Sequence, residues 1–333
     1  MSCEAVKLMD KKPGFSRAGY LHRIYMSYHA SLFVIVEGID HDRYLVDRIC
    51  RSSKLIKERG YEIRHVRQIR QARGVASGGK SAVLSFYDYC RRSCKLTQHN
   101  SGGPRSICFF VDRDGQQLTG GMRRSPHVVY TRLADSESHI FSDSDETEAL
   151  AAAASLDRRT VENLISHIGD WKRDLATAWR PWIEECYVAE AVRARCWVGF
   201  GSASSRVHTG TDGRTLDAVA LNAAREAIKG SALITGRKYD TIRTKILHKI
   251  AKVYESGNQV TLLKGKWLPA QLTYCVAEYF DGLGLRDEWN KSSFRTSVIY
   301  CYLANLDIFS TNVLELRGSL ESLLMTASLG AGG

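Results

Sequence analysis

Three apolar stretches of the chain each end in acidic residues, and these acids are the side chains best suited to chemistry. The stretches are FVIVEGIDHD at 33–42, ICFFVDRD at 107–114 and VVYTRLADSE at 128–137. Carboxylates are hard oxygen ligands, and Mg²⁺ binds one or two of them together with water and substrate phosphates. Carboxylates gathered closely repel one another unless a cation or raised pKa values relieve the repulsion. The pattern therefore predicts a divalent metal site.

Such a site would suit phosphoryl transfer, because a metal polarises a phosphate while a further carboxylate moves a proton. Acids also end strands and cap helices routinely, and this structural role is the alternative for any one of the three motifs alone. The candidate oxygen ligands are Glu37, Asp40, Asp112, Asp114, Asp135 and Glu137.

The apolar periodicity predicts an α/β domain followed by a mainly helical one. We expect strands at 32–36, 61–66, 107–111 and 128–131, helices at 42–59 and 82–95, and a loop at 98–106. This alternation predicts a mostly parallel sheet with helices on its faces, and such sheets bind ligands beyond the carboxyl ends of their strands. From Asp145 onward the pattern is helical, up to a loose tail at 328–333. The predicted domains are 1–143 and 144–333.

Composition and charge restrict the function classes. The 333 residues carry a formal net charge of +11. This charge could serve solubility alone, but we favour the interpretation that it binds a polyanionic partner such as nucleic acid. The nine cysteines have no framework spacing, so we expect reduced thiols in the cytoplasm. No stretch has the length and apolarity of a membrane span or a signal peptide, so we expect neither membrane association nor export.

The acidic motifs resemble those of a known family. VEG followed by a D-x-D element on a later strand is similar to the Toprim domain of topoisomerases, primases and OLD-type nucleases. VEGIDHDRYL, FFVDRDG and YTRLADSESHIF, together with KGKWLPAQL at 264–272, resemble Toprim-like phage-defence effectors found beside ABC/OLD-type ATPases. The nuclease component of the PARIS system is the best-known type of that family. His41 departs from the family's acidic pair after VEG, because it stands where the second acid is found.

The resemblance implies a Toprim-like fold and a Mg²⁺- or Mn²⁺-dependent endonuclease. Glu37 would be the general acid/base and, with Asp112, Asp114 and Glu137, would form the catalytic set. Asp40 would join these four residues as a metal ligand. An ATPase partner, a homodimer when active, and host RNA such as tRNA as substrate are implied in the same way. The alternative is a non-catalytic docking subunit of an ABC-type ATPase complex.

A rival motif and several basic residues lie in the same half of the chain. GVASGGKS at 74–81 fits the phosphate-binding loop of P-loop NTPases, although RQIRQAR separates it from the preceding strand and VEG has no role in such an enzyme. The residues expected to contact a nucleic-acid substrate, with RNA favoured over DNA, are Lys80, Arg113, Arg123 and Arg124. Charged residues of this kind are more often simply solvated. His41 and His139 adjoin the acids, where they could ligate metal, transfer protons or orient a ligand.

Overall fold

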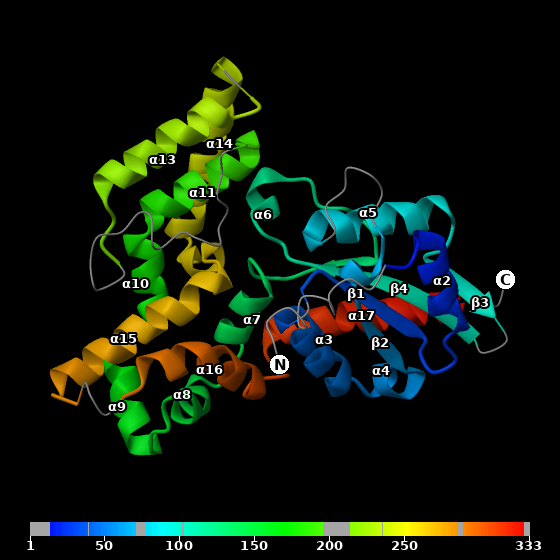
Figure 1. Ribbon diagram of the computed structural model, residues 1–333, viewed down its shortest axis with the longest axis horizontal. Helices are drawn as coiled ribbons and strands as arrows, with labels where there is room; N and C mark the ends of the chain where they lie inside the picture. The colour runs from blue at the N-terminus through cyan, green and yellow to red at the C-terminus, as the bar shows by residue number, and fades with distance from the viewer. Residues whose placement is uncertain are drawn as a thin grey trace, which may run out of the picture. The chain divides into compact units, whose positions relative to one another are not determined.

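The structure is a computed structural model that describes residues 14–38, 40–70, 78–100, 103–195, 214–234, 236–285 and 289–329. The chain forms two compact units that are interleaved along the sequence. The first contains Met1–Asp112, Arg123–Tyr130 and Thr311–Gly333, and the second contains Arg113–Met122 and Thr131–Ser310. The first unit is α/β, and the named elements of the second are helices (Figure 1). The predicted α/β class is confirmed.

A five-stranded sheet forms the centre of the first unit. Its strands are β1 (Leu32–Val36), β2 (Tyr61–His65), β3 (Thr97–Asn100), β4 (Gly103–Val111) and β5 (Val128–Tyr130). β1 lies between β2 and β4 and runs parallel to both. Both β3 and β5 lie beside β4, with β3 antiparallel to its first residues and β5 parallel to its last. The predicted mostly parallel sheet is therefore confirmed.

Different helices cover the two faces of this sheet. Side chains of a strand point alternately to opposite faces, and Phe33, Ile35 and Phe109 share one core with α2 and α5. α3, α4 and α17 lie on the side of the sheet away from α5 (Figure 1). The helices of this unit are α2 (Arg17–Met26), α3 (His41–Ser52), α4 (Lys54–Arg59), α5 (Gly79–Arg92) and α17 (Thr311–Leu329).

Helix α17 lies in the part of the chain that was predicted to be helical, and its last two residues occupy the start of the predicted loose tail. It packs on β4, α3 and α4 of the first unit. Its buried side chains recur at the three- and four-residue steps of an amphipathic helix; they are Val313, Leu316, Leu320, Leu323, Leu324 and Ala327. Because this helix belongs to the first unit, the compact units have other bounds than the predicted domains 1–143 and 144–333.

Two local predictions need correction. The helix predicted at 42–59 is two helices, because Ser53 is extended and its hydroxyl accepts a hydrogen bond from the Ile56 amide at 3.1 Å. Serine is a favoured N-cap residue, so α4 begins anew there. The loop predicted at 98–106 contains the β3–β4 hairpin, in which Gln98 is paired with Arg105. Gly103 and Pro104 are themselves strand residues of β4, paired with Asn100 and His99.

The second unit has a helical core. Trp171, Trp179 and Trp182 are buried in it, so these tryptophans pack rather than present surfaces to a ligand. Inside this unit Glu185 is fully buried, and one of its oxygens accepts from Arg225 and Arg243, each at 2.8 Å. The named elements are α6 (Gln116–Thr119), α7 (Ser136–Ser142), α8 (Glu146–Ala154), α9 (Arg158–Ile168), α10 (Trp171–Ala178), α11 (Arg180–Val192), α13 (Ala218–Ser231), α14 (Arg237–Glu255), the 3₁₀ helices η3 (Gln259–Leu262) and η4 (Gly265–Trp267), α15 (Leu268–Gly282) and α16 (Lys291–Ala304).

The cysteines in the described ranges are free thiols. Burial raises the pKa of Cys90 and of Cys108 to about 12. Since the thiolate is the reactive form, these two side chains are inert at neutral pH. Across the same ranges, no helix has the length and apolarity to cross a membrane.

We predict that α17 is needed for the stability of the first unit. Leu316→Ala removes a fully buried side chain, and the resulting cavity should destabilise the unit by about 2–5 kcal/mol. Leu314→Ala is the matched control, because Leu314 lies in the same helix and is 36% exposed. The measurement is the hydrogen-exchange rate of the β4 amides, which should rise in Leu316→Ala and stay near the wild-type rate in Leu314→Ala. Equal effects would show that α17 does not support the sheet.

Candidate functional site

Glu37 and Asp112 lie at the same edge of the first unit's sheet. Glu37 follows the last residue of β1, and Asp112 follows the last residue of β4. The two strands are adjacent and parallel, with Ile35 opposite Phe109. Counting forward in this register places the two acids one step apart along the edge. Asp112 is buried and Glu37 is partly buried. Both acids stand beyond the carboxyl ends of their strands, and the gathering of their carboxylates into one site stays a prediction.

Two further side chains hold the turn after β1. His65, at the end of β2, places Nε2 2.6 Å from the carbonyl oxygen of Glu37. Its Nδ1 accepts from the Arg67 amide at 3.2 Å, so Nε2 carries the proton and donates. Burial lowers the pKa of His65. The buried carboxylate of Asp42 accepts from the Gly38 amide at 2.7 Å. The backbone of Glu37 is thus fixed from both sides.

Asp40 stands at the start of α3, three residues beyond Glu37. Its side chain is exposed and makes no capping hydrogen bond within the described part of the chain. An exposed acid at a helix N-terminus interacts favourably with the helix dipole, which is a structural reason for its presence. His41 is the first residue of α3 and is partly buried. Either role for Asp40, metal ligand or helix partner, stays a prediction.

Asp114 belongs to the second unit and forms an ion pair with Lys264. Lys264 is almost fully buried. Burial alone would lower its pKa, but the carboxylates of Asp114 and Asp135 raise it above the usual value, so the amine is charged. Asp114 adopts a positive φ of 49°, and its amide donates to the Ala134 carbonyl at 2.7 Å. The carboxylate predicted as a metal ligand therefore already balances a buried ammonium group.

Asp135 and Glu137 lie at the start of α7 in the same unit. Asp135 is the N-cap, and its Oδ1 accepts from the Ser138 amide at 2.8 Å and from the Gly265 amide at 3.0 Å. Burial, followed by the charge of Glu137, raises the pKa of Asp135. Glu137 is buried in the first turn of the helix. The DSE motif thus joins η4 to α7.

His139 has a structural role in the second unit. Its Nε2 accepts from the amides of Arg132 and Leu133 at 2.8 and 3.2 Å. Its Nδ1 lies 2.7 Å from the carboxylate of Asp143, so Nδ1 carries the proton and donates. The ring is fully buried. Both nitrogens are occupied by these contacts, which leaves none for a metal.

The four predicted substrate-binding residues have different surroundings. Arg113 is partly buried in the second unit, where its guanidinium donates to the Arg132 carbonyl at 2.9 Å. Lys80 lies in the first turn of α5, after Gly79 with a φ of 74°. Arg123 and Arg124 are exposed in the segment before β5, and Arg123 pairs with Asp88 at 2.9 Å. Residues 74–77 of the P-loop-like motif lie outside the described residues, so the NTPase alternative stays a prediction.

The five predicted metal ligands are divided between the two units. Glu37, Asp40 and Asp112 belong to the first unit, and Asp114 and Glu137 to the second. Among the described residues, no group of three or more His, Cys, Asp or Glu side chains is arranged to hold a metal ion. A single site made of all five carboxylates stays a prediction.

Lys264 and His65 are the residues that the sequence analysis did not assign to the site. Lys264 opens KGKWLPAQL and interrupts an otherwise apolar run, which is the signal that it is buried with a partner. That partner, Asp114, is separated from it by 150 residues. His65 ends a strand parallel to β1, so its position beside Glu37 follows from the strand order and not from spacing.

Comparison with known proteins adds no assignment. No protein-family model matches the chain, and a search of curated proteins finds no match. The Toprim-type resemblance therefore depends on the short motifs alone.

We predict that Lys264 is essential for the stability of the second unit. Lys264→Met leaves Asp114 and Asp135 without their buried counter-charge, which should cost about 3–5 kcal/mol of folding free energy. Lys266→Met is the matched control two residues away, because Lys266 is exposed. Thermal unfolding of the two variants tests this. A control as unstable as Lys264→Met would refute the assignment.

We also predict that Gly265 cannot be replaced. A Cβ at this position would lie 2.2 Å from the Ser138 nitrogen and 2.4 Å from the Glu137 carbonyl carbon, so backbone would have to move. Gly265→Ala should destabilise the unit by about 1–3 kcal/mol or more. Gly282→Ala meets no atom within 4 Å and should be neutral or slightly stabilising. Urea unfolding distinguishes the two, and equal midpoints would contradict the close approach of η4 to α7.

Proposed function

We propose that the protein is a metal-dependent nuclease that cleaves nucleic acid, with Glu37 and Asp112 at its reactive centre. The observation that carries the proposal is the placement of these two acids at the ends of adjacent parallel strands. Ligands of open α/β sheets bind at this edge. The net charge of +11 supports a polyanionic substrate.

The residues of the first unit fit a hard divalent cation. Mg²⁺ commonly takes only one or two protein carboxylates and completes its shell with water and phosphate oxygens. Glu37 and Asp112 supply two such carboxylates, and the exposed Asp40 follows three residues later. When bound, Mg²⁺ or Mn²⁺ would polarise the phosphodiester and offset the negative charge that develops during hydrolysis. Asp114 and Glu137 remain predicted ligands from the sequence pattern.

The chain's own contribution would be proton transfer and positioning. The Glu37 carboxylate would take a proton from the attacking water as the new P–O bond forms and would return a proton to the leaving oxygen as the old bond breaks. His65 and Asp42 would keep Glu37 in place through their bonds to the turn backbone. A fixed turn limits the positions that the Glu37 carboxylate can adopt, so less entropy is lost when it reacts.

The resemblance to Toprim-like phage-defence effectors extends this proposal. It implies host RNA such as tRNA as substrate, an ABC/OLD-type ATPase as partner, a homodimer as the active form and a role in abortive infection in the cytoplasm. RNA is favoured over DNA on this resemblance.

A non-catalytic docking subunit of an ATPase complex is the second candidate. The pairing of Asp114 with Lys264 favours it, because an acid that balances a buried ammonium group has less charge to offer a metal. The two candidates make opposite predictions for activity.

We predict metal-dependent cleavage that needs Glu37 and Asp112. Glu37→Gln and Asp112→Asn should each lower the cleavage rate by at least about 100-fold, since each removes a group needed in the transition state. The assay incubates full-length protein with labelled RNA and DNA in Mg²⁺, in Mn²⁺ and in EDTA. EDTA should abolish cleavage.

The matched control is Glu58→Gln on α4, where the side chain of Glu58 is 64% exposed. It should cleave at the wild-type rate. A wild-type protein that cleaves neither substrate in either metal would leave the docking role as the better candidate. ATP hydrolysis that is lost in Lys80→Ala would instead favour the P-loop alternative.

A further inference from the structure

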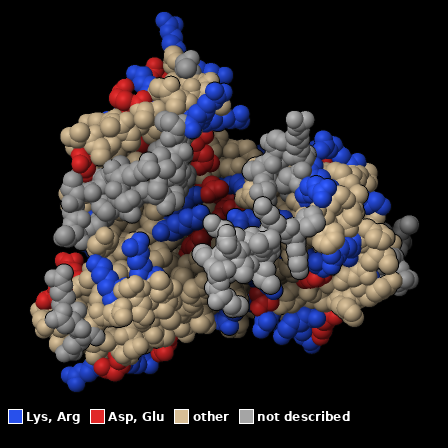
Figure 2. All heavy atoms as spheres, viewed as in Figure 1, with Lys and Arg blue, Asp and Glu red and all other residues tan. Residues whose placement is uncertain are grey.

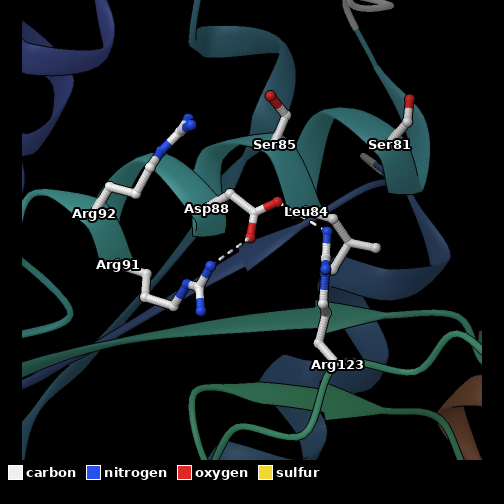
Figure 3. A pocket seen from close by; sticks show the side chains of 7 residues that line it. All are labelled: Ser81, Leu84, Ser85, Asp88, Arg91, Arg92 and Arg123. Carbon is white, nitrogen blue, oxygen red and sulfur yellow. Dashed lines mark hydrogen bonds and ion pairs between the residues drawn. The ribbon is translucent and has the colours of Figure 1, made fainter.

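A groove of about 470 Å³ lies on the outer side of α5 in the first unit. Figure 3 shows its side chains, which come from α5 and from the segment that contains Arg123. The polar residues that line it are Ser81, Ser85, Asp88, Arg91, Arg92 and Arg123. Leu84 is its apolar residue. The groove is separate from the edge that carries Glu37 and Asp112, since neither residue lines it.

Asp88 organises two of the arginines. One carboxylate oxygen is 2.9 Å from Nη2 of Arg123, and the other is 4.0 Å from Nη2 of Arg91. Arg91 and Arg123 point toward Asp88, whereas Arg92 extends away from it (Figure 3). An arginine held in place by a carboxylate loses less side-chain entropy when it binds a second anion. The Arg123 guanidinium group is therefore held in place at the groove, and the Arg91 guanidinium group lies within ion-pair distance of the same carboxylate.

The lining is positively charged and rich in donors. Three arginines against one aspartate leave two net positive charges. Arg17 adds a further guanidinium at the rim, where it donates to the Ser85 hydroxyl at 2.7 Å. Lys and Arg side chains also gather over the part of the first unit where α5 lies (Figure 2). Guanidinium groups match phosphate oxygens in geometry as well as charge.

We propose that this groove binds the phosphodiester backbone of a nucleic acid. Its lining contains arginines and serine hydroxyls, which contact phosphates. Among the described residues, the lining has none of the aromatic side chains on which bases stack. The contact is therefore independent of base sequence. The inference that the bound nucleic acid is the substrate rests on the proposed nuclease function. The inference that the groove binds phosphates does not rest on it.

The test measures binding without cleavage. Full-length protein in EDTA is titrated onto fluorescein-labelled 20-nucleotide RNA and DNA, and the affinity is followed by anisotropy over a range of salt concentrations. Each phosphate contact contributes about 0.7 to the slope of log affinity against log salt for a single strand. Arg91→Gln/Arg92→Gln should therefore reduce the slope by about 1.4 and weaken binding to all sequences alike.

The matched control is Lys54→Gln/Lys57→Gln on α4, which removes the same two charges from exposed residues on the other side of the sheet. Its slope should equal that of the wild type. A groove variant that behaves like this control would overturn the proposal. Displacement of the oligonucleotide by millimolar inorganic phosphate at constant ionic strength would also overturn it, because the groove would then be a site for free phosphate.

The failures of the two proposals can be told apart. If the wild type cleaves nucleic acid but the groove variant keeps the wild-type salt slope, the groove proposal is wrong and the nuclease proposal stands. If no metal supports cleavage but the groove variant loses slope, the groove binds backbone phosphates in a protein that is not a nuclease.

Discussion

The burial of β1 on both faces is the constraint on which the first unit depends. Every residue from Leu32 to Val36 is buried. A charged side chain within the strand would therefore lose its hydration and gain no ion pair or hydrogen bond in exchange. The first carboxylate can stand only after the strand, at Glu37. The last part of β4, from Ile107 to Val111, is buried and uncharged in the same way, and Asp112 follows it. Parallel pairing then brings the two strand ends to one edge. The location of the proposed chemistry thus follows from the packing that stabilises the sheet.

In the second unit, charges are buried together with their counter-charges. Lys264 is enclosed with Asp114 and Asp135, and Glu185 with Arg225 and Arg243. Removing one member of such a group leaves an uncompensated charge in a medium of low polarity. For Asp114 this has a chemical consequence, because a divalent cation and the Lys264 ammonium group would compete for one carboxylate.

The parts of the fold that depend on local pattern could be predicted from the sequence, and the parts that depend on distant partners could not. Apolar runs ending in acids predicted β1, β4 and β5, since burial and strand ends are local properties. The pairing of Lys264 with Asp114 joins residues far apart in the chain, which no spacing reveals. The position of His65 required the strand order. The β3–β4 hairpin was not predicted, because the glycines and the proline in its sequence are typical of a loop.

The position of α17 in the sequence has a consequence for protein synthesis. The helix begins at Thr311, 181 residues after Tyr130 ends the last strand (311 − 130 = 181). A ribosome adds about 5–20 residues each second. One face of the sheet therefore waits roughly 10–40 seconds for its covering helix while the second unit is being made. During this interval the nascent chain exposes the apolar surface that α17 later covers, so the first unit matures only after the second has been made.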